Sequence, residues 1–326
     1  HLWVTESGRW TPKRLAAFDV ASGNVWKEFF GPTSYGASGA GFDPADASRW
    51  FGQGTLFKLD MAARTAQPLA ILGGKEGRSY RYWRQDGRTF VIACGKATWI
   101  QELRSDNTLK PLALVSSAHQ FAYACDWKPP DAFVEAFRRA YPDKKYTRGT
   151  SGQPTHGFGM MWVDRSGDGE LQADEIEFST AADNFGGSGW GHDFHDLALR
   201  VAGKVDDKTV LVTLKPDGWH PSGAPRYPAL NDAVKAGVPI DLTHCNVEST
   251  TDRFGNVIVN SDPVMKAFAP DGRLLWTYPN RWSNVHGSHR APLPSAGELQ
   301  GVLFFTGAAP LDERADVVAM NGNHGR

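Results

Sequence analysis

Short apolar runs recur along the chain, and turn residues separate them. The clearest runs, each followed by glycine, aspartate or proline turns, are 2–5, 15–20, 56–59, 90–93, 210–214, 257–259 and 302–305. Such runs are too short for amphipathic helices and match the usual length of β-strands. The pattern therefore predicts an all-β fold with many hairpins.

One segment has a helical pattern instead. Two prolines at 129 and 130, followed by Asp131, form a helix start signal, and Pro142 supplies the stop. The apolar residues that fall on one face between them are Phe133, Val134, Phe137 and Ala140. We expect a helix here, inserted between sheets.

Two hairpin-like segments repeat each other. Residues 14–26 read RLAAFDVASGNVW, and residues 264–276 read VMKAFAPDGRLLW. In both, Ala-Phe precedes a polar turn with glycine, and a tryptophan follows eight residues after the phenylalanine, although the glycine position differs by one. The repeat predicts a hairpin whose tryptophan packs across onto the neighbouring sheet.

The first copy, A-x-D-x-x-x-G-x-x-W, resembles the blade repeat of quinoprotein (PQQ-type) β-propellers. In that family the tryptophan docks one blade on the next. Turn signals at intervals of about 40 to 50 residues also fit propeller blades. The resemblance implies one β-propeller domain over residues 1–326 with about seven blades, six to eight being compatible. The helix and a metal loop would form an insertion at about 126–190. A pair of β-sandwiches, or another antiparallel β fold, is the alternative.

Composition narrows the class of protein. Apolar residues at 41% and charged residues at 22% are typical of a soluble globular protein. With 35 basic against 36 acidic residues, no basic face is implied, so nucleic acid is not an expected partner. No apolar run approaches the roughly 20 residues that a membrane span needs.

The first residue of the chain and its cysteines give information on where in the cell the protein resides. The chain begins at His1 rather than methionine, which indicates a product trimmed at one or both ends whose signal peptide has been removed. Cys94, Cys125 and Cys245 form no CxxC motif. One disulfide with one cysteine left over and three buried thiols are both compatible with them.

Residues 164–175 read DRSGDGELQADE and carry the clearest chemical motif. An EF-hand-type loop needs oxygen ligands at positions 1, 3, 5, 7, 9 and 12 and a glycine at position 6. The predicted ligands are Asp164, Ser166, Asp168, Glu170 through its carbonyl, Gln172 directly or through water, and Glu175 as a bidentate carboxylate. Gly169 takes the bend, and Leu171 anchors the loop. Only Ser166 departs from the strict pattern, and its hydroxyl is still an oxygen ligand.

The expected role of this ion is structural. A calcium sensor needs paired helix–loop–helix units, whereas residues 157–163 read as an incoming strand and no second loop follows. A single weak loop needs the millimolar calcium found outside the cytoplasm, so we expect a bacterial protein exported to the periplasm or beyond. An acidic surface turn without metal is the alternative.

Histidines gather beside glycine turns in the second half of the chain. The candidates for a site are His192, His195, His244, His286 and His289, with Arg290 beside the last of them. If equivalent positions of successive blades converge, these side chains form a site for zinc, manganese or iron, or supply a general base, as in some propeller lyases. Alternatively, they hydrogen-bond neighbouring loops and tie the blades together.

Three functions follow from these features. The first is a calcium-binding module that binds a protein or a carbohydrate on one propeller face. The second is a metal-dependent, lyase-like enzyme that uses the histidines, and the third is a PQQ-dependent oxidoreductase. Aromatic residues near Trp219, Tyr227, Tyr278 and Trp282 are able to stack on sugar rings, although at this density aromatics more often form the core.

Overall fold

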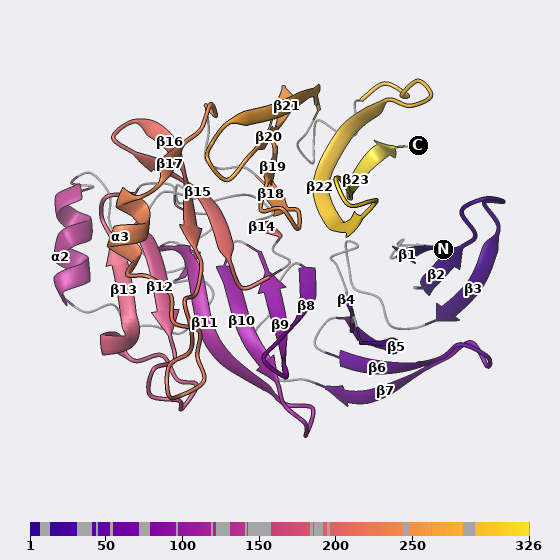
Figure 1. Ribbon diagram of the computed structural model, residues 1–326, viewed down its shortest axis with the longest axis horizontal. Coiled ribbons are helices and arrows are strands. Elements are labelled where there is room, and N and C mark those ends of the chain that lie inside the picture. Colours follow the sequence, from indigo (N-terminus) through magenta and orange to yellow (C-terminus); the bar gives the residue numbers. More distant parts are fainter. Residues whose placement is uncertain are drawn as a thin grey trace. The chain divides into compact units, whose positions relative to one another are not determined.

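The structure is a computed structural model. It describes residues 1–6, 14–30, 41–43, 45–52, 55–71, 79–95, 97–118, 120–121, 131–140, 142, 158–182, 185, 192–193, 196–243, 248–261, 263–282 and 291–325. Most of these residues lie in strands. The strands form six sheets, in which neighbouring strands are mainly antiparallel. The predicted all-β class is confirmed at this level (Figure 1).

The chain forms two compact units. The first contains residues 1–93 and 100–111, and the second contains residues 94–99 and 112–326. Within the described residues, no helix is long and apolar enough to cross a membrane.

Two sheets pack together in the first unit. Their strands are β1 (Leu2–Glu6), β2 (Arg14–Phe18) and β3 (Val25–Phe30), then β4 (Gly41–Asp43), β5 (Asp46–Gly52), β6 (Thr55–Asp60) and β7 (Thr65–Ile71). Each sheet keeps its strands in chain order. Leu15 and Phe29 from one sheet form a buried cluster with Trp50 and Leu59 from the other. Along β6, Phe57 and Leu59 share one face and pack into this cluster, whereas Lys58 and Asp60 on the other face are exposed.

Another sheet has six strands. Its strands are β8 (Ser79–Gln85), β9 (Arg88–Cys94), β10 (Ala97–Leu103), β11 (Leu109–Ser117), β12 (Gly159–Val163) and β13 (Ile176–Ser179), paired in chain order. All five residues of β12 are buried, so this strand is covered on both faces. Cys94, at the end of β9, is a buried thiol, whereas Cys125 and Cys245 lie outside the described residues.

The predicted helix is confirmed as α2 (Asp131–Ala140), between β11 and β12. Asp131 lies in its first turn and Arg138 and Arg139 in its last, which suits the helix dipole. Phe133 is fully buried, and its ring centroid lies 5.8 Å from Phe158 and 5.3 Å from Phe178. The apolar face therefore packs beside β12 and β13.

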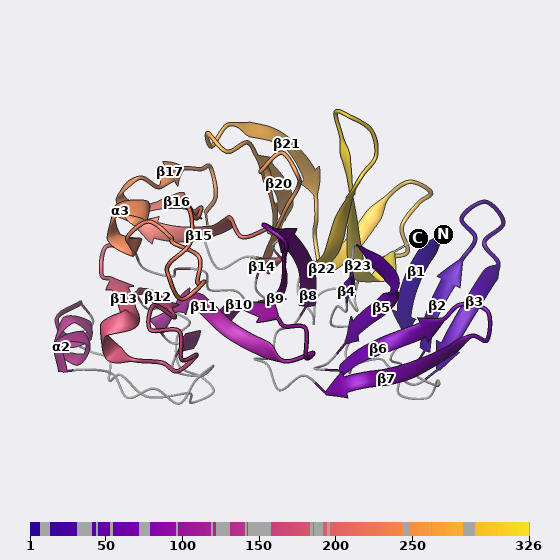
Figure 2. The ribbon, with the colours of Figure 1, turned by 60° about the horizontal axis from the view of Figure 1, so that its bottom comes forward.

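Three further sheets complete the second unit (Figure 2). The first has β15 (Leu199–Val205), β16 (Lys208–Leu214) and β17 (Val238–Pro239), with α3 (Leu230–Lys235) before β17. The next has β14 (His192–Asp193), β18 (Glu248–Thr251), β19 (Val257–Asn260), β20 (Val264–Phe268) and β21 (Leu274–Pro279). The last has β22 (Leu299–Pro310) and β23 (Asp316–Gly325). Successive sheets share buried clusters: Leu211 packs with Val257, and Ile258 packs with Phe305.

The two repeated segments both form hairpins, β2–β3 and β20–β21, as the sequence predicts. The strand pairing shifts at the same place in each, between Ala17 and Phe18 and between Ala267 and Phe268. A β-bulge at this step bends the strand and increases its twist. The repeat thus corresponds to one local structure.

The tryptophans of the two repeats do not occupy equivalent positions. Ala267 pairs with Trp276, whereas Ala17 pairs with Lys27, because the first turn is one residue longer. Trp26 and Trp276 lie on the edge strands β3 and β21, and each keeps 41% of its surface exposed. Their predicted docking onto a neighbouring sheet is not confirmed.

The turn of the second hairpin requires a glycine. Gly272 has a φ of +84°, and a Cβ atom there would lie 2.6 Å from both the carbonyl oxygen of Pro239 and Cγ1 of Val238. We expect Gly272→Ala to lower the free energy of unfolding by about 3 kcal/mol, since it adds a backbone clash to the cost of the left-handed conformation. Urea denaturation measures this loss.

Gly23 provides the matched control for that substitution. It has a φ of +70° in the turn of the first hairpin, and a Cβ atom there would meet no described atom within 4 Å. Gly23→Ala should therefore cost only about 1 kcal/mol, the conformational part. Equal losses in the two variants would show that the contact with Pro239 and Val238 is unimportant.

Candidate metal centre

The Asp164–Glu175 loop is the connection of a β-hairpin. It leaves β12 after Val163 and returns through the short 3₁₀ helix Ala173–Glu175 into β13, with Trp162 paired to Ile176. The predicted incoming strand is confirmed, and a strand also follows the loop. Two strands in place of two helices favour a loop that is fixed in position.

Backbone contacts fasten the start of the loop to its surroundings. The Asp164 N–H donates to the carbonyl oxygen of Leu112 in β11 at 2.9 Å. The Ser222 hydroxyl donates to the carbonyl oxygen of Asp164 at 2.6 Å. The first residue of the loop is thus fixed by the sheet and by a segment 58 residues away.

Two glycines give the loop its tight course. Gly167 has a φ of +87° and Gly169 a φ of +78°, which is the left-handed region that side chains with a Cβ rarely adopt. Gly169 is the residue that the sequence assigns to the sharp bend. With these bends, the backbone N–H groups of both glycines turn inward toward Asp164.

Asp164 is fully buried, and its carboxylate organises the first half of the loop. Its Oδ1 atom accepts hydrogen bonds from the N–H of Gly167 at 2.9 Å and from the N–H of Gly169 at 3.1 Å. Such bonds fix the direction in which the carboxylate points. The first predicted ligand is therefore oriented by the loop backbone.

Glu175 is 2% exposed and closes the loop at the other end. Its Oε1 atom accepts from the N–H of Ser166 at 2.6 Å, and its Oε2 atom accepts from the indole Nε1–H of Trp162 at 3.0 Å. The structure therefore brings the first and last predicted ligands into one hydrogen-bonded loop. The sequence did not single out Trp162, although its place in the apolar run before Asp164 was visible.

The remaining predicted ligands lie on the more exposed side of the loop. Asp168 accepts a hydrogen bond through Oδ1 from the N–H of Glu170 at 2.9 Å, and through Oδ2 from the Gln172 side-chain amide. The Ser166 hydroxyl lies 3.5 Å from Oδ1 of Asp164. Hydrogen bonds within the loop therefore link Gln172 to Asp168, and Ser166 to Asp164.

The donor set fits a hard cation. Every predicted ligand atom is an oxygen, and calcium prefers carboxylate, carbonyl and hydroxyl oxygens. Two carboxylates are buried on this loop, and a divalent cation bound to both would offset the cost of burying their charges. Among the described residues, no Lys or Arg nitrogen lies within ion-pair distance of Glu175. In the part of the chain that the structure describes, no group of three or more His, Cys, Asp or Glu side chains is arranged to hold a metal ion.

Basic side chains lie at the rim of the loop. The Arg165 guanidinium donates to the carbonyl oxygen of Asp174 and lies 3.9 Å from Oε1 of Glu177. Glu177 in turn accepts from the N–H of Leu230 at the start of α3, at 2.8 Å. Burial, with a further contribution from the charge of Arg165, lowers the pKa of His220 below its usual value. A neutral His220 adds no positive charge near the loop.

The predicted histidine site falls mostly outside the described residues. His195, His244, His286, His289 and Arg290 are not described, and His192 is described only as backbone in β14, which pairs with β18. Neither the metal-site interpretation nor the blade-tying one is tested by the rest of the chain.

The aromatic candidates for sugar stacking differ in burial and in hydrogen bonding. Tyr227 is 8% exposed, and its hydroxyl donates to the carbonyl oxygen of Leu197 at 2.8 Å, so it belongs to the core. The Tyr278 hydroxyl accepts from the N–H of Leu299 at 2.9 Å. Trp282 remains 37% exposed. The expectation that such aromatics serve the core is therefore met by Tyr227.

Comparisons with known proteins add little. No protein-family model matches the sequence, and no curated protein sequence does either. Among solved structures, the chain is similar to hydrazine synthase from Kuenenia stuttgartiensis, at 9% identity over 82% of this chain and 81% of that chain, with a TM-score of 0.37. BamB from Moraxella catarrhalis gives 12% identity over 82% and 71%, with a TM-score of 0.30. Regucalcin, a calcium-binding protein from Agrobacterium tumefaciens, gives 12% over 74% and 73%, with a TM-score of 0.23. Similarities this low carry no conclusion about function.

Proposed function

We propose that this protein is a calcium-stabilised β-sheet scaffold that binds a protein or carbohydrate partner. The observation that carries the proposal is the loop of residues 164–175, in which Asp164 and Glu175 are both buried and are held by hydrogen bonds from the loop backbone and from Trp162. Asp164, Ser166, Asp168, Glu170, Gln172 and Glu175 would hold the ion.

The proposed ion has a structural role. It would neutralise the two buried carboxylates and fix the connection between β12 and β13, which are already paired as strands. An ion that binds the folded chain and not the unfolded one stabilises the folded chain by mass action. Because the Asp168 side of the loop is exposed to solvent and the loop has no paired second loop, we propose an affinity suited to the calcium concentrations outside the cytoplasm, and hence an exported protein.

The propeller architecture is also part of the proposal. Its support is local: β4 to β7 and β18 to β21 each form a four-stranded antiparallel arrangement in chain order. Buried clusters connect successive sheets within each unit. Propeller blades have this strand order and this packing.

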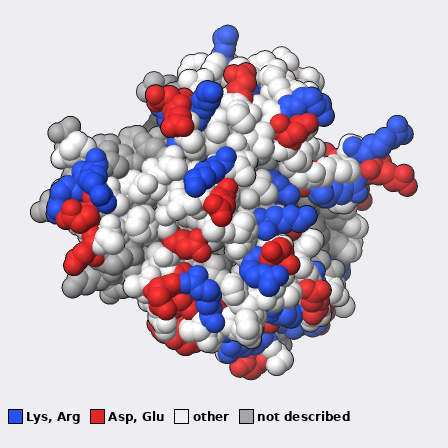
Figure 3. Space-filling view, turned by 60° about the vertical axis from the view of Figure 1, so that its left-hand side comes forward, with Lys and Arg blue, Asp and Glu red and all other residues white. Residues whose placement is uncertain are grey.

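A binding role is supported by the outer strand of one of these sheets. In the edge strand β21, the consecutive residues Leu274, Leu275 and Trp276 are 40%, 37% and 41% exposed. Large apolar side chains on an exposed edge strand are typical of surfaces that contact partners. On the face shown in Figure 3, the basic and acidic side chains of the described residues are interspersed.

Calcium titration of the chelator-stripped protein tests the calcium proposal. We expect one bound ion per chain by metal analysis, and a gain in unfolding free energy of about 2.7 kcal/mol when free calcium reaches 100 times Kd. Magnesium should give a much smaller gain, because it demands near-ideal octahedral geometry. A chain that binds no calcium at millimolar concentration, with an unchanged unfolding temperature, would overturn the proposal.

A further inference from the structure

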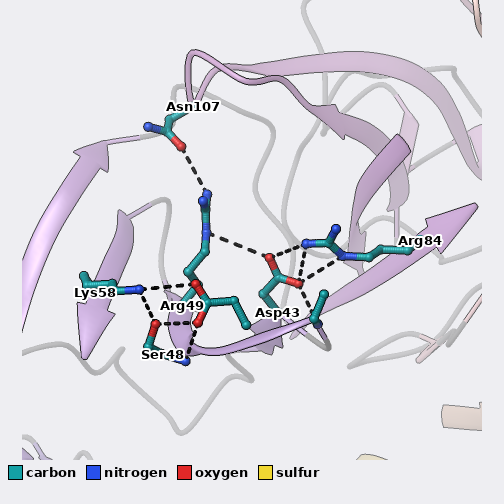
Figure 4. Close-up of polar contacts among 8 residues, drawn as sticks. Asp43, Ser48, Arg49, Lys58, Arg84 and Asn107 are labelled. Atoms are coloured by element: carbon teal, nitrogen blue, oxygen red, sulfur yellow. Dashed lines mark hydrogen bonds and ion pairs between the residues drawn. The ribbon is translucent and has the colours of Figure 1, made fainter. Parts of the chain in front are cut away.

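A second polar cluster lies in the first unit, around the buried carboxylate of Asp43 (Figure 4). Asp43 ends β4, and its side chain is 2% exposed. Arg84 in β8 donates hydrogen bonds to this carboxylate from one side. Its Nη2 atom lies 2.8 Å from both carboxylate oxygens, and its Nε atom lies 3.2 Å from Oδ1. The N–H of Ala45 also donates to Oδ1, at 3.0 Å. The carboxylate is therefore well supplied with donors by Arg84 and the backbone.

Arg49 in β5 approaches the same carboxylate from the other side. Its Nε atom lies 3.9 Å from Oδ2 of Asp43, beyond hydrogen-bond distance, and its Nη2 atom donates to Oδ1 of Asn107 at 3.1 Å. Two guanidinium charges thus face one carboxylate charge. Lys58 does not alter this surplus, because it pairs with Asp46 at 3.2 Å. The cluster carries one net positive charge.

Two buried donors in this cluster have no acceptor among the described residues. They are Nε of Arg49 and the hydroxyl of Tyr82, whose side chain comes from β8 and is 8% exposed. Burial, reinforced by the charge of Asp43, raises the pKa of Tyr82, so the hydroxyl keeps its proton and is available as a donor. A buried donor without an acceptor costs free energy, so such groups normally have a partner.

The backbone around these donors is closely packed. A Cβ atom on Gly41 in β4 would lie 2.9 Å from the carbonyl oxygen of Tyr80 and 3.3 Å from Cδ2 of Tyr82. Glycine therefore lets β4 approach β8, and this contact places Asp43 near Tyr82. The side chains of Arg49 and Arg84 are 29% and 46% exposed, so solvent reaches the edge of the cluster.

We propose that Arg49 and Tyr82 bind a small oxyanion, a carboxylate or a phosphate, beside Asp43. Such an anion supplies acceptors to both buried donors and also balances the surplus positive charge. A neutral ligand would supply acceptors but would leave the positive charge unbalanced. Arginine presents its donors in a planar fork that suits both kinds of anion. This site is independent of the calcium loop and goes beyond the proposed function.

Calorimetric titration with sodium phosphate and, separately, with sodium acetate tests the site at constant ionic strength. We expect saturable binding of at least one anion. Tyr82→Phe and Arg49→Lys should each weaken it about tenfold or more, because each removes one charge-assisted hydrogen bond while preserving size or charge. Lys58→Gln is the matched control, since it removes a neighbouring positive charge that is already paired, and its affinity should equal that of the unaltered chain.

Thermal unfolding of the same proteins separates the site from a general salt effect. Without added anion, Tyr82→Phe should leave the unfolding temperature unchanged or raise it, because it removes a buried hydroxyl that has no acceptor. With saturating anion, the unaltered chain should gain more than Tyr82→Phe. Binding by phosphate alone, or by acetate alone, identifies the class of anion. The proposal is overturned if neither anion gives a saturable heat of binding. It is also overturned if all variants bind equally, because that result indicates an adventitious ion only.

Discussion

Replacement of Glu175 by glutamine is expected to weaken calcium binding on the order of 100-fold and to abolish most of the calcium-dependent rise in unfolding temperature. The substitution keeps the size of a side chain that is 2% exposed, but it removes one full negative charge and the symmetric pair of carboxylate oxygens. Losing one partner of a buried charge interaction costs about 3 kcal/mol, which corresponds to that change in affinity. Calorimetric titration with calcium measures it.

Glu170→Gln is the matched control for this prediction. It makes the same change of charge in the same loop, but Glu170 is exposed and is proposed to bind through its carbonyl oxygen. Its calcium affinity should fall by no more than about threefold, the effect of a distant screened charge. Similar losses in the two variants would mean that the loop attracts calcium only by its net charge, and the assignment of Glu175 as a ligand would fail.

Trp162→Phe is expected to lower both stability and calcium affinity. Trp162 is fully buried, and its indole packs edge-on against Trp99 with ring centroids 6.0 Å apart. Removing part of this ring should cost about 2 to 4 kcal/mol of unfolding free energy. The loss of the 3.0 Å bond from Nε1 to Glu175 should also lower calcium affinity roughly tenfold, as for other residues that orient a metal ligand.

Trp99→Phe separates these two effects. Trp99 is 1% exposed and forms the other half of the same ring pair, so its replacement should reduce stability by a similar amount. Its calcium affinity should stay close to that of the unaltered chain, because this variant keeps the Trp162 indole that donates to Glu175. If both tryptophan variants lose affinity equally, Trp162 acts through the core and does not position Glu175.

Local features were predictable from the sequence because short-range physics determines them. The proline start signal and the apolar spacing of 131–140 specify a helix wherever the segment packs. The apolar runs at 90–93 and 257–259 became the buried strands β9 and β19. Gly169, at position 6 of the loop of residues 164–175, has the positive φ that the predicted sharp bend requires. Each of these depends on residues within a few positions of one another.

The repeated hairpins show that a matching sequence motif does not by itself predict how its tryptophan packs. The two segments align by their Ala-Phe and tryptophan residues, and both carry the same bulge. One extra residue in the first turn nevertheless moves Trp26 out of the position that Trp276 occupies. A shift of one residue turns a side chain to the other face of a strand, so a matching motif does not ensure matching packing.

The sequence by itself determined the antiparallel β class, the helix 131–140, and a loop of oxygen donors with calcium spacing. Only the tertiary structure decided that Trp162 donates to Glu175 and that Arg49, Tyr82 and Arg84 meet around the buried carboxylate of Asp43. Arg84 and Asp43 are 41 residues apart in the chain, and their contact depends on how β4 and β8 approach each other. Spacing within a loop fixes which atoms are able to surround an ion, whereas contacts between strands depend on register and packing, which no short segment encodes.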